Sequence, residues 1–374
     1  MKRLTSFISG CVQRRWGTLL FASVTLCPFT SFGQQFQETD LVANASQTGV
    51  KVVDVDPNVV NAWGIARSSA GPWWISDEGK GVSTIYNASG QDAPPVLVTI
   101  PSAGQTPAGS PTGIVFNGSS DFEVAPGKPG IFIFATFDGT IAAWNPGVNP
   151  TVAIQKVKLP QGSVLTGLTI AEDEGQRLLY ATDVREGGIR VFDTNFKPAE
   201  TKRREFRDNH LPAKFVPFNI QNIGGNLYVS FAEQNQAKTF VNPGANLGAV
   251  GVFSPDGKLL FSFERGQWFD APWGIVQAPS DFGAFSHSIL VGQFGSGQIV
   301  AFDAVTGRFQ GALQDQNGQP IQHDGLWALA FGAGNTNSGP ANGLFFNAGP
   351  NAGTAGLFGF LTPVAADLTQ GNDQ

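Results

Sequence analysis

A short tripeptide recurs at nearly constant spacing and constrains the fold more than any other feature of the sequence. Each copy begins with an aromatic residue or threonine, continues with glycine, asparagine or alanine, and ends with isoleucine or leucine. The six copies, which we call anchors, are Trp63-Gly64-Ile65, Thr112-Gly113-Ile114, Thr166-Gly167-Leu168, Phe218-Asn219-Ile220, Trp273-Gly274-Ile275 and Trp327-Ala328-Leu329. Their middle residues are 49, 54, 52, 55 and 54 residues apart. Six near-equal repeats predict a radial or solenoid array of similar units.

Each repeat contains four short runs of β-branched and aromatic residues separated by turn-forming residues. In the second repeat these runs cover residues 113–116, 131–136, 140–145 and 152–159, and the fourth run of the third repeat covers residues 202–206. The 47 glycines and 24 prolines supply the turns, and no amphipathic stretch of useful length favours a helix. Such runs predict strands joined by tight turns. Four strands in each of six repeats predict an all-β fold, a six-bladed β-propeller with four antiparallel strands per blade.

The sixth repeat has no fourth run after residues 357–362, whereas an unassigned strand-like stretch, Gln37 to Asn44, precedes the first anchor. We assign this N-terminal strand to the outer position of blade six, because closing the ring removes an exposed sheet edge. The predicted organisation is a single propeller domain over residues 34–364, followed by a polar C-terminal tail over residues 365–374.

The first 33 residues have the features of a secretory signal peptide. Their only charged residues are Lys2, Arg3, Arg14 and Arg15, and an apolar run follows from residue 16 to residue 32. The run is too short and too poorly flanked for a stable membrane span, so we expect a cleaved signal over residues 1–33. We therefore expect export to the periplasm or the cell exterior, with the general secretory and twin-arginine routes both open.

Removal of this segment changes the composition. It leaves 19 basic and 29 acidic residues, a net charge of −10, and takes away both cysteines, Cys11 and Cys27. Without cysteine there is no disulfide, thiol nucleophile or thiolate metal site. The negative charge disfavours nucleic acid and anionic membrane surfaces as partners. We expect a monomer with no membrane span.

The propeller geometry predicts where functional side chains gather. The innermost strand of a blade begins on the face where the second strand ends, so residues at both places converge on one rim around the axis. Near the anchors, the rim candidates are Asn61, Trp63, Ser110, Thr112, Thr166, Asn219, Trp273, Asp324 and Trp327. At the ends of the second strands, they are Asp77, Thr136, Asp138, Asp183, Glu233, Gln293 and Asn347.

This set of residues supports two chemical interpretations and one structural interpretation. Carboxylate and amide oxygens are the ligands that Ca²⁺ prefers, which makes Asp77, Asp183, Asn219 and Glu233 candidate ligands of Ca²⁺ or another divalent cation. The same oxygens together with the tryptophans would suit a carbohydrate or another polyhydroxylated ligand. Alternatively, aspartate and asparagine shape turns, and large aromatic residues fill the centre of the ring. The sequence leaves these interpretations open.

Other catalytic patterns are missing from the sequence. The three histidines, His210, His287 and His323, are scattered without the spacing of paired metal ligands. No serine lies in a Gly-x-Ser-x-Gly motif. Asp138-Gly139 is typical of a hairpin turn.

Several longer stretches resemble a family of secreted bacterial propeller proteins, some of which end in a PEP-CTERM sorting tail. The stretches include Pro72-Trp73-Trp74-Ile75-Ser76-Asp77, Pro217-Phe218-Asn219-Ile220-Gln221-Asn222, Asp281-Phe282-Gly283-Ala284-Phe285-Ser286 and Asp324-Gly325-Leu326-Trp327-Ala328-Leu329. More loosely, the chain is similar to NHL-type propellers. The resemblance implies a propeller but no established activity, and the chain departs from the sorted members by lacking their tail.

Two functions follow as hypotheses. The first is a binding protein that takes a small-molecule or carbohydrate ligand, or a protein partner, on its axial face. The second is a divalent-cation-dependent hydrolase, similar to six-bladed lactonases, with its site at the central channel. In that case the cation would polarise a carbonyl group and Asp77, Asp183 or Glu233 would act as the catalytic base. The sequence does not decide whether the protein is an enzyme.

Overall fold

The structure is a computed structural model that describes residues 34–45, 51–104, 108–199 and 206–364. The chain separates into residues 1–32 and residues 33–374, and the description below concerns the second unit. The predicted signal peptide and C-terminal tail lie outside the described residues. So does most of the outer strand predicted at residues 202–206 of blade three.

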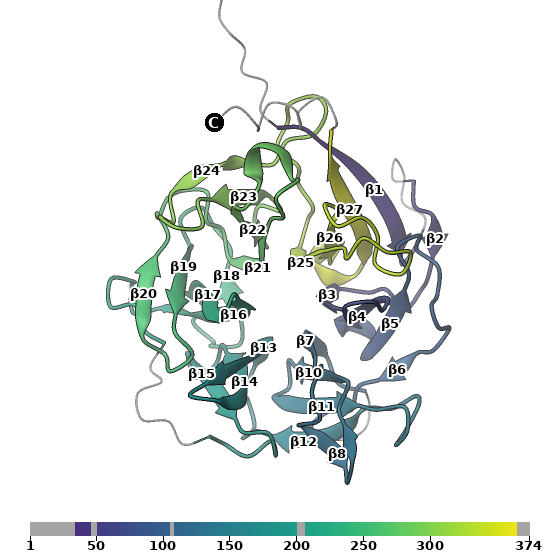
Figure 1. Cartoon of the computed structure of the whole chain (residues 1–374). Helices are drawn as coiled ribbons and strands as arrows, with labels where there is room; N and C mark the ends of the chain where they lie inside the picture. Colours follow the sequence, from purple (N-terminus) through teal and green to yellow (C-terminus); the bar gives the residue numbers. More distant parts are fainter. Residues whose placement is uncertain (1–33, 46–50, 105–107, 200–205, 365–374) are drawn as a thin grey trace, which may run out of the picture. The chain divides into compact units, whose positions relative to one another are not determined.

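Six antiparallel sheets are arranged in a ring (Figure 1), which confirms the predicted six-bladed β-propeller. The innermost strands of blades one to six are β3 (Ala62–Ala66), β7 (Pro111–Phe116), β13 (Leu165–Asp173), β16 (Phe215–Ile223), β21 (Pro272–Gln277) and β25 (Leu326–Phe331). The second strands are β4 (Trp73–Asp77), β10 (Phe132–Thr136), β14 (Gln176–Asp183), β17 (Asn226–Gln234), β22 (Ile289–Gln293) and β26 (Leu344–Ala348). Each anchor therefore lies in an innermost strand.

The third and outer strands complete the blades. The third strands are β5 (Val82–Tyr86), β11 (Thr140–Trp144), β15 (Gly188–Phe192), β19 (Gly248–Phe253), β23 (Ile299–Phe302) and β27 (Leu357–Pro363). The outer strands of blades one, two, four, five and six are β6 (Val98–Thr99), β12 (Ile154–Lys158), β20 (Leu259–Ser262), β24 (Phe309–Ala312) and β1 (Phe36–Ala43). Four short strands lie outside this pattern: β2 (Asp54–Val55), β8 (Glu123–Ala125), β9 (Lys128–Pro129) and β18 (Val241–Asn242).

In the described part of the chain, helical structure is limited to single turns. These are the 3₁₀ turns η1 (Glu78–Lys80) and η2 (Gly283–Phe285) and the four-residue α1 (Pro350–Gly353). Within the described ranges, no helix is long and apolar enough to cross a lipid bilayer.

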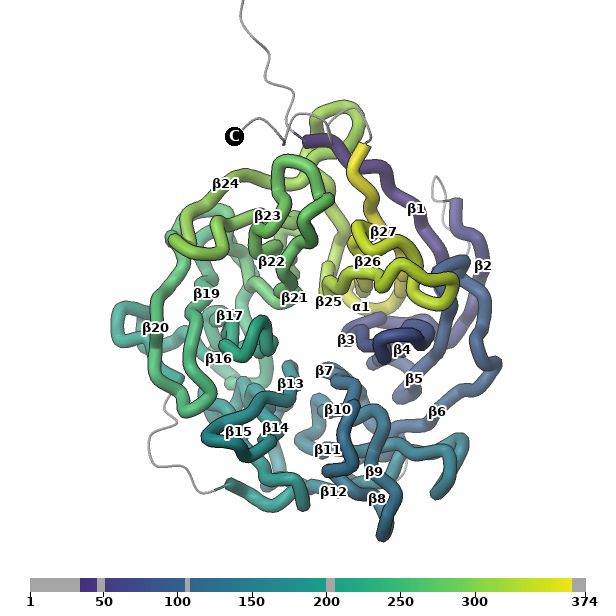
Figure 2. The backbone as a smooth tube through the Cα atoms, in the orientation of Figure 1, coloured from purple at the N-terminus to yellow at the C-terminus, as the bar shows by residue number. Residues whose placement is uncertain are grey.

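Blade six is built from both ends of the described chain. Strand β1 pairs antiparallel with β27 from Phe36 opposite Pro363 to Ala43 opposite Leu357, with a bulge between Asp40 and Val42. Figure 2 shows the two strands, purple and yellow, side by side. The predicted closing strand at residues 37–44 is therefore confirmed.

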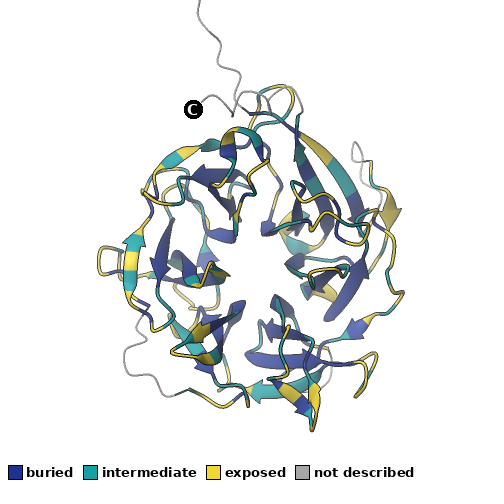
Figure 3. Cartoon of the chain, in the orientation of Figure 1, coloured by how far each residue is buried: buried dark blue, intermediate teal, exposed yellow. Residues whose placement is uncertain are grey.

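Neighbouring blades pack through aromatic side chains on both faces of each sheet. Successive side chains of a strand point to opposite faces. In β4, Trp73 therefore packs on Phe345 of blade six at 4.6 Å between ring centres, whereas Trp74 packs on Phe132 of blade two at 4.2 Å. Buried residues dominate the strands near the axis, and exposed residues gather on outer strands and loops (Figure 3). The core is thus divided among the interfaces between blades.

Close packing of the innermost strands explains why glycine recurs in the anchors. A Cβ atom at Gly64 would lie 2.3 Å from the carbonyl oxygen of Thr112 in the next blade. A Cβ atom at Gly167 would lie 2.4 Å from Oδ1 and 2.7 Å from Cα of Asn219. Real Cβ atoms do not approach other heavy atoms this closely, so these positions require glycine. The repeat seen in the sequence is a consequence of ring closure.

The closing strand also contains a partly exposed acidic pair, Glu38 and Asp40, that predicts a pH effect. Although 35% of the Glu38 side chain is exposed, burial of the rest and the nearby Asp40 carboxyl group raise the pKa of Glu38 to about 8. The folded protein then holds this proton more tightly than the unfolded chain. The resulting stabilisation is fully present below about pH 4.5 and is lost as the pH rises towards about 8.

We expect Glu38→Gln to remove this loss, so that its melting temperature falls less than that of the wild type between pH 5 and pH 8. His323, whose Nε2 lies 3.7 Å from Glu38 Oε1, also titrates on unfolding, because burial lowers its pKa to about 4. Burial also raises the pKa of Asp40. His323 and Asp40 are present in both proteins, so the difference between their melting curves reports the loss of the Glu38 carboxyl group and of its interaction with Asp40. The control is Glu174→Gln at an exposed turn. Parallel curves for wild type and Glu38→Gln would contradict the prediction.

Candidate functional site

A pocket of about 430 Å³ opens on the axis, on the face where the innermost strands begin. We call it the axial pocket. Its lining combines loops that enter innermost strands with loops that leave second strands, as the propeller geometry predicts. The first group contributes Asn61 and Asp324, and the second contributes Glu78, Phe137, Phe294 and Gly349. The remaining side of the pocket includes Phe240 and Pro243 from the loop around β18.

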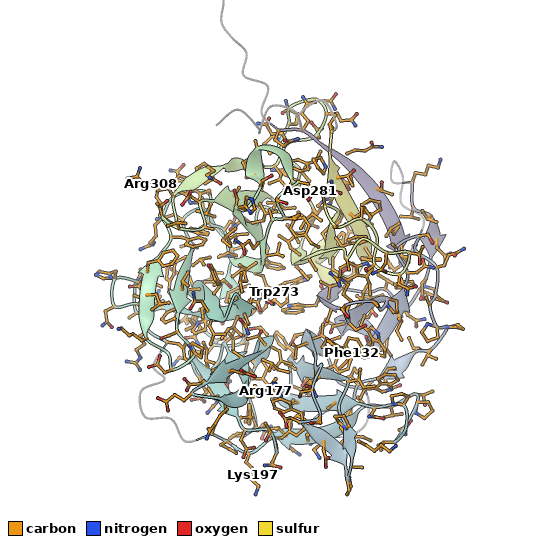
Figure 4. All side chains as sticks on the ribbon, in the orientation of Figure 1. Phe132, Arg177, Lys197, Trp273, Asp281 and Arg308 are labelled. Carbon is orange, nitrogen blue, oxygen red and sulfur yellow. The ribbon has the colours of Figure 1, made fainter. Side chains whose placement is uncertain are left out.

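Three tryptophans from blades one, five and six fill the channel beneath this pocket. Trp63, Trp273 and Trp327 are each 2% exposed. The rings of Trp63 and Trp327 stack at 3.6 Å between centres, and Trp273 meets both edge-on at 6.3 and 5.9 Å. Figure 4 shows Trp273 at the centre of the ring. Because each of these residues is almost completely buried, the three tryptophans form a closed floor and offer no free ring face for stacking.

Phe240 connects the aromatic residues of the pocket wall. Its ring contacts five aromatic rings at 5.6 to 6.3 Å between centres, namely those of Trp63, Phe137, Phe218, Phe294 and Trp327. Phe137, Phe240 and Phe294 are each only partly buried. The wall therefore presents apolar aromatic surface to the pocket.

A chain of hydrogen bonds joins the floor to the mouth. Trp327 Nε1 donates to Asn61 Oδ1 at 2.9 Å, and Asn61 Nδ2 donates to Glu78 Oε2 at 2.9 Å. Asn61 has a φ of 48°, a left-handed conformation that asparagine tolerates better than most residues. In the neighbouring blade six, Asp324 Oδ2 accepts a bond from the backbone N–H of Asn351 at 2.8 Å. The pocket thus has two carboxylates, and its lining includes no lysine, arginine or histidine.

The three candidate catalytic acids lie in separate places. Asp77 is fully buried, its Oδ2 accepts bonds from the Thr84 N–H and Oγ1 at 3.0 and 2.8 Å, and burial raises its pKa well above its usual range. Asp183 is also buried and accepts a bond from Arg190 Nε at 3.1 Å. Glu233 accepts a bond from Asn242 Nδ2 at 3.1 Å. Each acid is engaged within its own blade.

These placements also bear on the candidate metal ligands. Across the described residues, no group of three or more histidine, cysteine, aspartate or glutamate side chains is arranged to hold a metal ion. The structure therefore does not bring Asp77, Asp183, Asn219 and Glu233 together as one coordination sphere.

Four predicted rim residues, three on innermost strands and Asn347 on the second strand β26, instead tie neighbouring blades to one another. Thr112 Oγ1 donates to the Leu165 carbonyl at 2.8 Å, and Thr166 Oγ1 donates to the Phe218 carbonyl at 2.6 Å. Asn219 Nδ2 donates to the Trp273 carbonyl at 2.7 Å, and Asn347 Nδ2 to the Gly64 carbonyl at 3.1 Å. Each bond crosses from one blade to the next. These side chains are buried in the ring and do not line the axial pocket.

Two further rim candidates shape loops. Asp138 Oδ2 accepts a bond from the backbone N–H of Ala103 at 2.6 Å, and its Oδ1 accepts one from Thr136 Oγ1 at 2.5 Å. Gln293 Oε1 accepts a bond from the backbone N–H of Asp270 at 2.9 Å. Of the predicted rim residues, Asn61, Trp63, Asp324 and Trp327 line the axial pocket.

The pocket residues that sequence reasoning missed lie one position farther along the chain. The last residue of the second strand is fully buried in blades one, two, three and five. The next residue belongs to the pocket or to the axial aromatic cluster, namely Glu78, Phe137, Val184 and Phe294. Alternation of side chains along a strand explains this offset. In two repeats the residue directly after the second strand is aromatic, and this pattern could have indicated that the position faces the axis. Phe240 has no counterpart in the other repeats.

A second cavity, of about 660 Å³, lies at the other end of the channel and is lined by the distal parts of the innermost strands. We call it the distal cavity. Trp273 belongs to its lining, so the aromatic floor lies between it and the axial pocket. Its charged residue is Arg67, whose Nη2 donates to the Phe331 carbonyl at 2.7 Å and whose guanidinium lies 5.2 Å from the Trp73 ring centre.

Comparison with known proteins finds relatives over most of the chain. No family model matches the sequence. One uncharacterized protein of Acanthamoeba polyphaga mimivirus is 31% identical over 338 residues, covering 86% of this chain and 78% of the relative. A second mimivirus protein is 30% identical over 329 residues, covering 84% and 83% of the two chains. The chain belongs to the family of these mimivirus proteins. The comparison does not support the predicted membership of a family of secreted bacterial propellers, because the relatives that define the family are mimivirus proteins.

Solved structures of other proteins superpose on this chain and support its propeller fold. Streptogramin B lyase superposes with a TM-score of 0.51 at 14% identity, covering 88% of this chain and 97% of the lyase. A protein of unknown function from Bacteroides thetaiotaomicron gives a TM-score of 0.53 at 11% identity, covering 88% and 76%. At these identities the likeness concerns the propeller fold alone.

Proposed function

We propose that the protein binds a small organic ligand with an apolar, aromatic-sized body in the axial pocket. The supporting observation is the pocket itself, about 430 Å³ with partly exposed Phe137, Phe240 and Phe294 around a rigid tryptophan floor. Small-molecule sites are concave, of a few hundred Å³, mainly apolar and aromatic, with a few placed polar groups. The axial pocket meets each of these criteria.

The geometry favours this ligand class over the others considered. A carbohydrate would need many polar side chains for its hydroxyl groups, but the carboxylate and amide side chains of the lining are Asn61, Glu78 and Asp324 alone. A divalent-cation-dependent hydrolase would need converging acids, but Asp77, Asp183 and Glu233 are engaged separately. Binding of an apolar small molecule therefore remains the function that the pocket supports best.

The test uses 2-phenylethanol as an uncharged aromatic probe in isothermal titration calorimetry. For a ligand of this size we expect a dissociation constant of about 1 mM. Phe240→Ala should weaken binding about tenfold or more, which corresponds to about 1.4 kcal/mol. The substitution removes the ring that connects the aromatic residues of the pocket wall.

Phe309→Ala serves as the matched control. It removes a partly buried phenylalanine that stacks on Trp268 at 4.2 Å in the outer part of blade five, outside the pocket lining. Its affinity for 2-phenylethanol should equal that of the wild type. Failure of the folded wild-type protein to bind the probe saturably, or equal binding by Phe240→Ala, would overturn the proposed function.

A further inference from the structure

We infer that the ligand of the axial pocket carries a positively charged nitrogen beside its apolar body, an inference that rests on the proposed function. Glu78 and Asp324 are the charged residues of the pocket lining. Their hydrogen-bond partners are neutral groups, the Asn61 amide and the Asn351 backbone N–H. None of the ion pairs formed within the described parts of the chain includes either carboxylate. The pocket therefore carries two negative charges, on the partly buried Glu78 and the exposed Asp324, that no cationic side chain among the described residues pairs.

The protein fixes one of these charges in position without compensating it. Glu78 begins η1 directly after β4, and its backbone N–H donates to the Asn61 carbonyl at 3.3 Å. The Asn61 side chain connects the Glu78 carboxylate to the buried indole of Trp327. One carboxylate oxygen is thereby oriented by a neutral donor, and the other is free to accept a bond from a ligand. A charge held this way is suited to a charge-assisted hydrogen bond.

The aromatic wall adds a second attraction for a cation. The faces of aromatic rings carry negative electrostatic potential and attract ammonium and guanidinium groups within about 6 Å. Phe137, Phe240 and Phe294 provide such rings in the same lining as the two carboxylates, and no cationic residue competes for them within that lining. Residues 34–374 carry a net charge of −10, which favours approach of a cation over an anion.

The pocket also contains a polar group that the chain leaves unused. Trp63 is 2% exposed and lines the pocket, and its buried indole N–H has no hydrogen-bond partner among the residues that the structure describes. A buried donor without a partner raises the free energy of the folded protein. A bound molecule with an acceptor atom would satisfy it. An unsatisfied donor at the floor of the pocket therefore favours a bound molecule over an empty pocket.

An organic cation fits this pocket better than a metal ion does. Ca²⁺ requires six to eight oxygen ligands, whereas the pocket offers two carboxylates among phenylalanine rings. An ammonium group on an apolar body uses both the carboxylates and the aromatic wall. Ca²⁺ is nevertheless included in the test as a competing occupant.

The experiment compares three probes that share one aromatic body: 2-phenylethylammonium, 2-phenylethanol and 3-phenylpropanoate. Calorimetry at pH 7 and low salt should show the cation binding about tenfold or more tightly than the alcohol, and the anion binding most weakly. In the double variant Glu78→Gln/Asp324→Asn, the difference between cation and alcohol should disappear. The control Glu174→Gln/Asp281→Asn removes the same charge at exposed positions and should keep the wild-type order.

The outcomes separate this inference from the proposed function. If the alcohol binds as tightly as the cation, the ligand need not be cationic and the inference is overturned, while the proposed function stands. If no probe binds, the proposed function itself fails. If Ca²⁺ binds in a way that the double variant abolishes, and the organic cation shows no preference over the alcohol, the carboxylates serve a metal and the inference is likewise overturned.

Discussion

Gly167→Val is expected to lower the free energy of unfolding by about 3 kcal/mol or more, because it places side-chain atoms where the next blade already lies. The Cβ atom alone would lie 2.7 Å from the Asn219 Cα. Asn219 cannot move aside easily, since its backbone N–H bonds to Ser230 Oγ at 3.0 Å and its side chain bonds to the Trp273 carbonyl at 2.7 Å. Relief of the clash would displace blade four from the ring.

Urea unfolding of purified protein measures this effect, and Gly188→Val is the matched control. Gly188 begins β15, and a Cβ atom there would meet no heavy atom within 4 Å. We expect the control to change stability by less than about 0.5 kcal/mol. Equal stabilities of Gly167→Val and Gly188→Val would contradict the explanation of the anchor glycines.

Deletion of β1 is expected to have the second large effect. Phe36, Leu41 and Val42 on this strand are at most 2% exposed, and Phe36 packs on Phe282 at 4.8 Å between ring centres. Loss of these three buried side chains costs about 5 kcal/mol or more. The deletion also leaves β27 with an unpaired edge, which promotes association between copies.

The comparison is between a chain that starts at Gln34 and one that starts at Asn44. The shorter chain should melt at a lower temperature and form aggregates in size-exclusion chromatography. Gln37→Ala, at an exposed position of the same strand, should behave as the longer chain does. A shorter chain that stays monomeric with an unchanged melting temperature would show that β1 does not close the ring.

The architecture was predictable because its causes are local and repeated. The close approach of neighbouring innermost strands imposes glycine at Gly64, Gly113, Gly167 and Gly274, so a packing constraint appears directly as a sequence period. The closing strand could be inferred by counting strands. Most of the outer strand predicted for blade three falls outside the described residues and is not tested.

The candidate site was less predictable, because it depends on the direction of single side chains. An offset of one residue at a strand end decides whether a side chain packs within the blade or faces the axis, as in Asp77 and Glu78. Both residues are acidic, yet Asp77 is fully buried between strands and Glu78 lines the pocket. Phe240 lies in an irregular loop of one blade, and only ring closure brings it to the axis.

The most direct test of the axial pocket as a ligand site is a crystal structure of the chain from Gln34 with 2-phenylethylammonium bound. We expect the aromatic ring of the probe against Phe240, with its nitrogen facing the carboxylates of Glu78 and Asp324. Probe density in the distal cavity near Arg67, or on the outer surface of the blades with the axial pocket holding only water, would contradict this account.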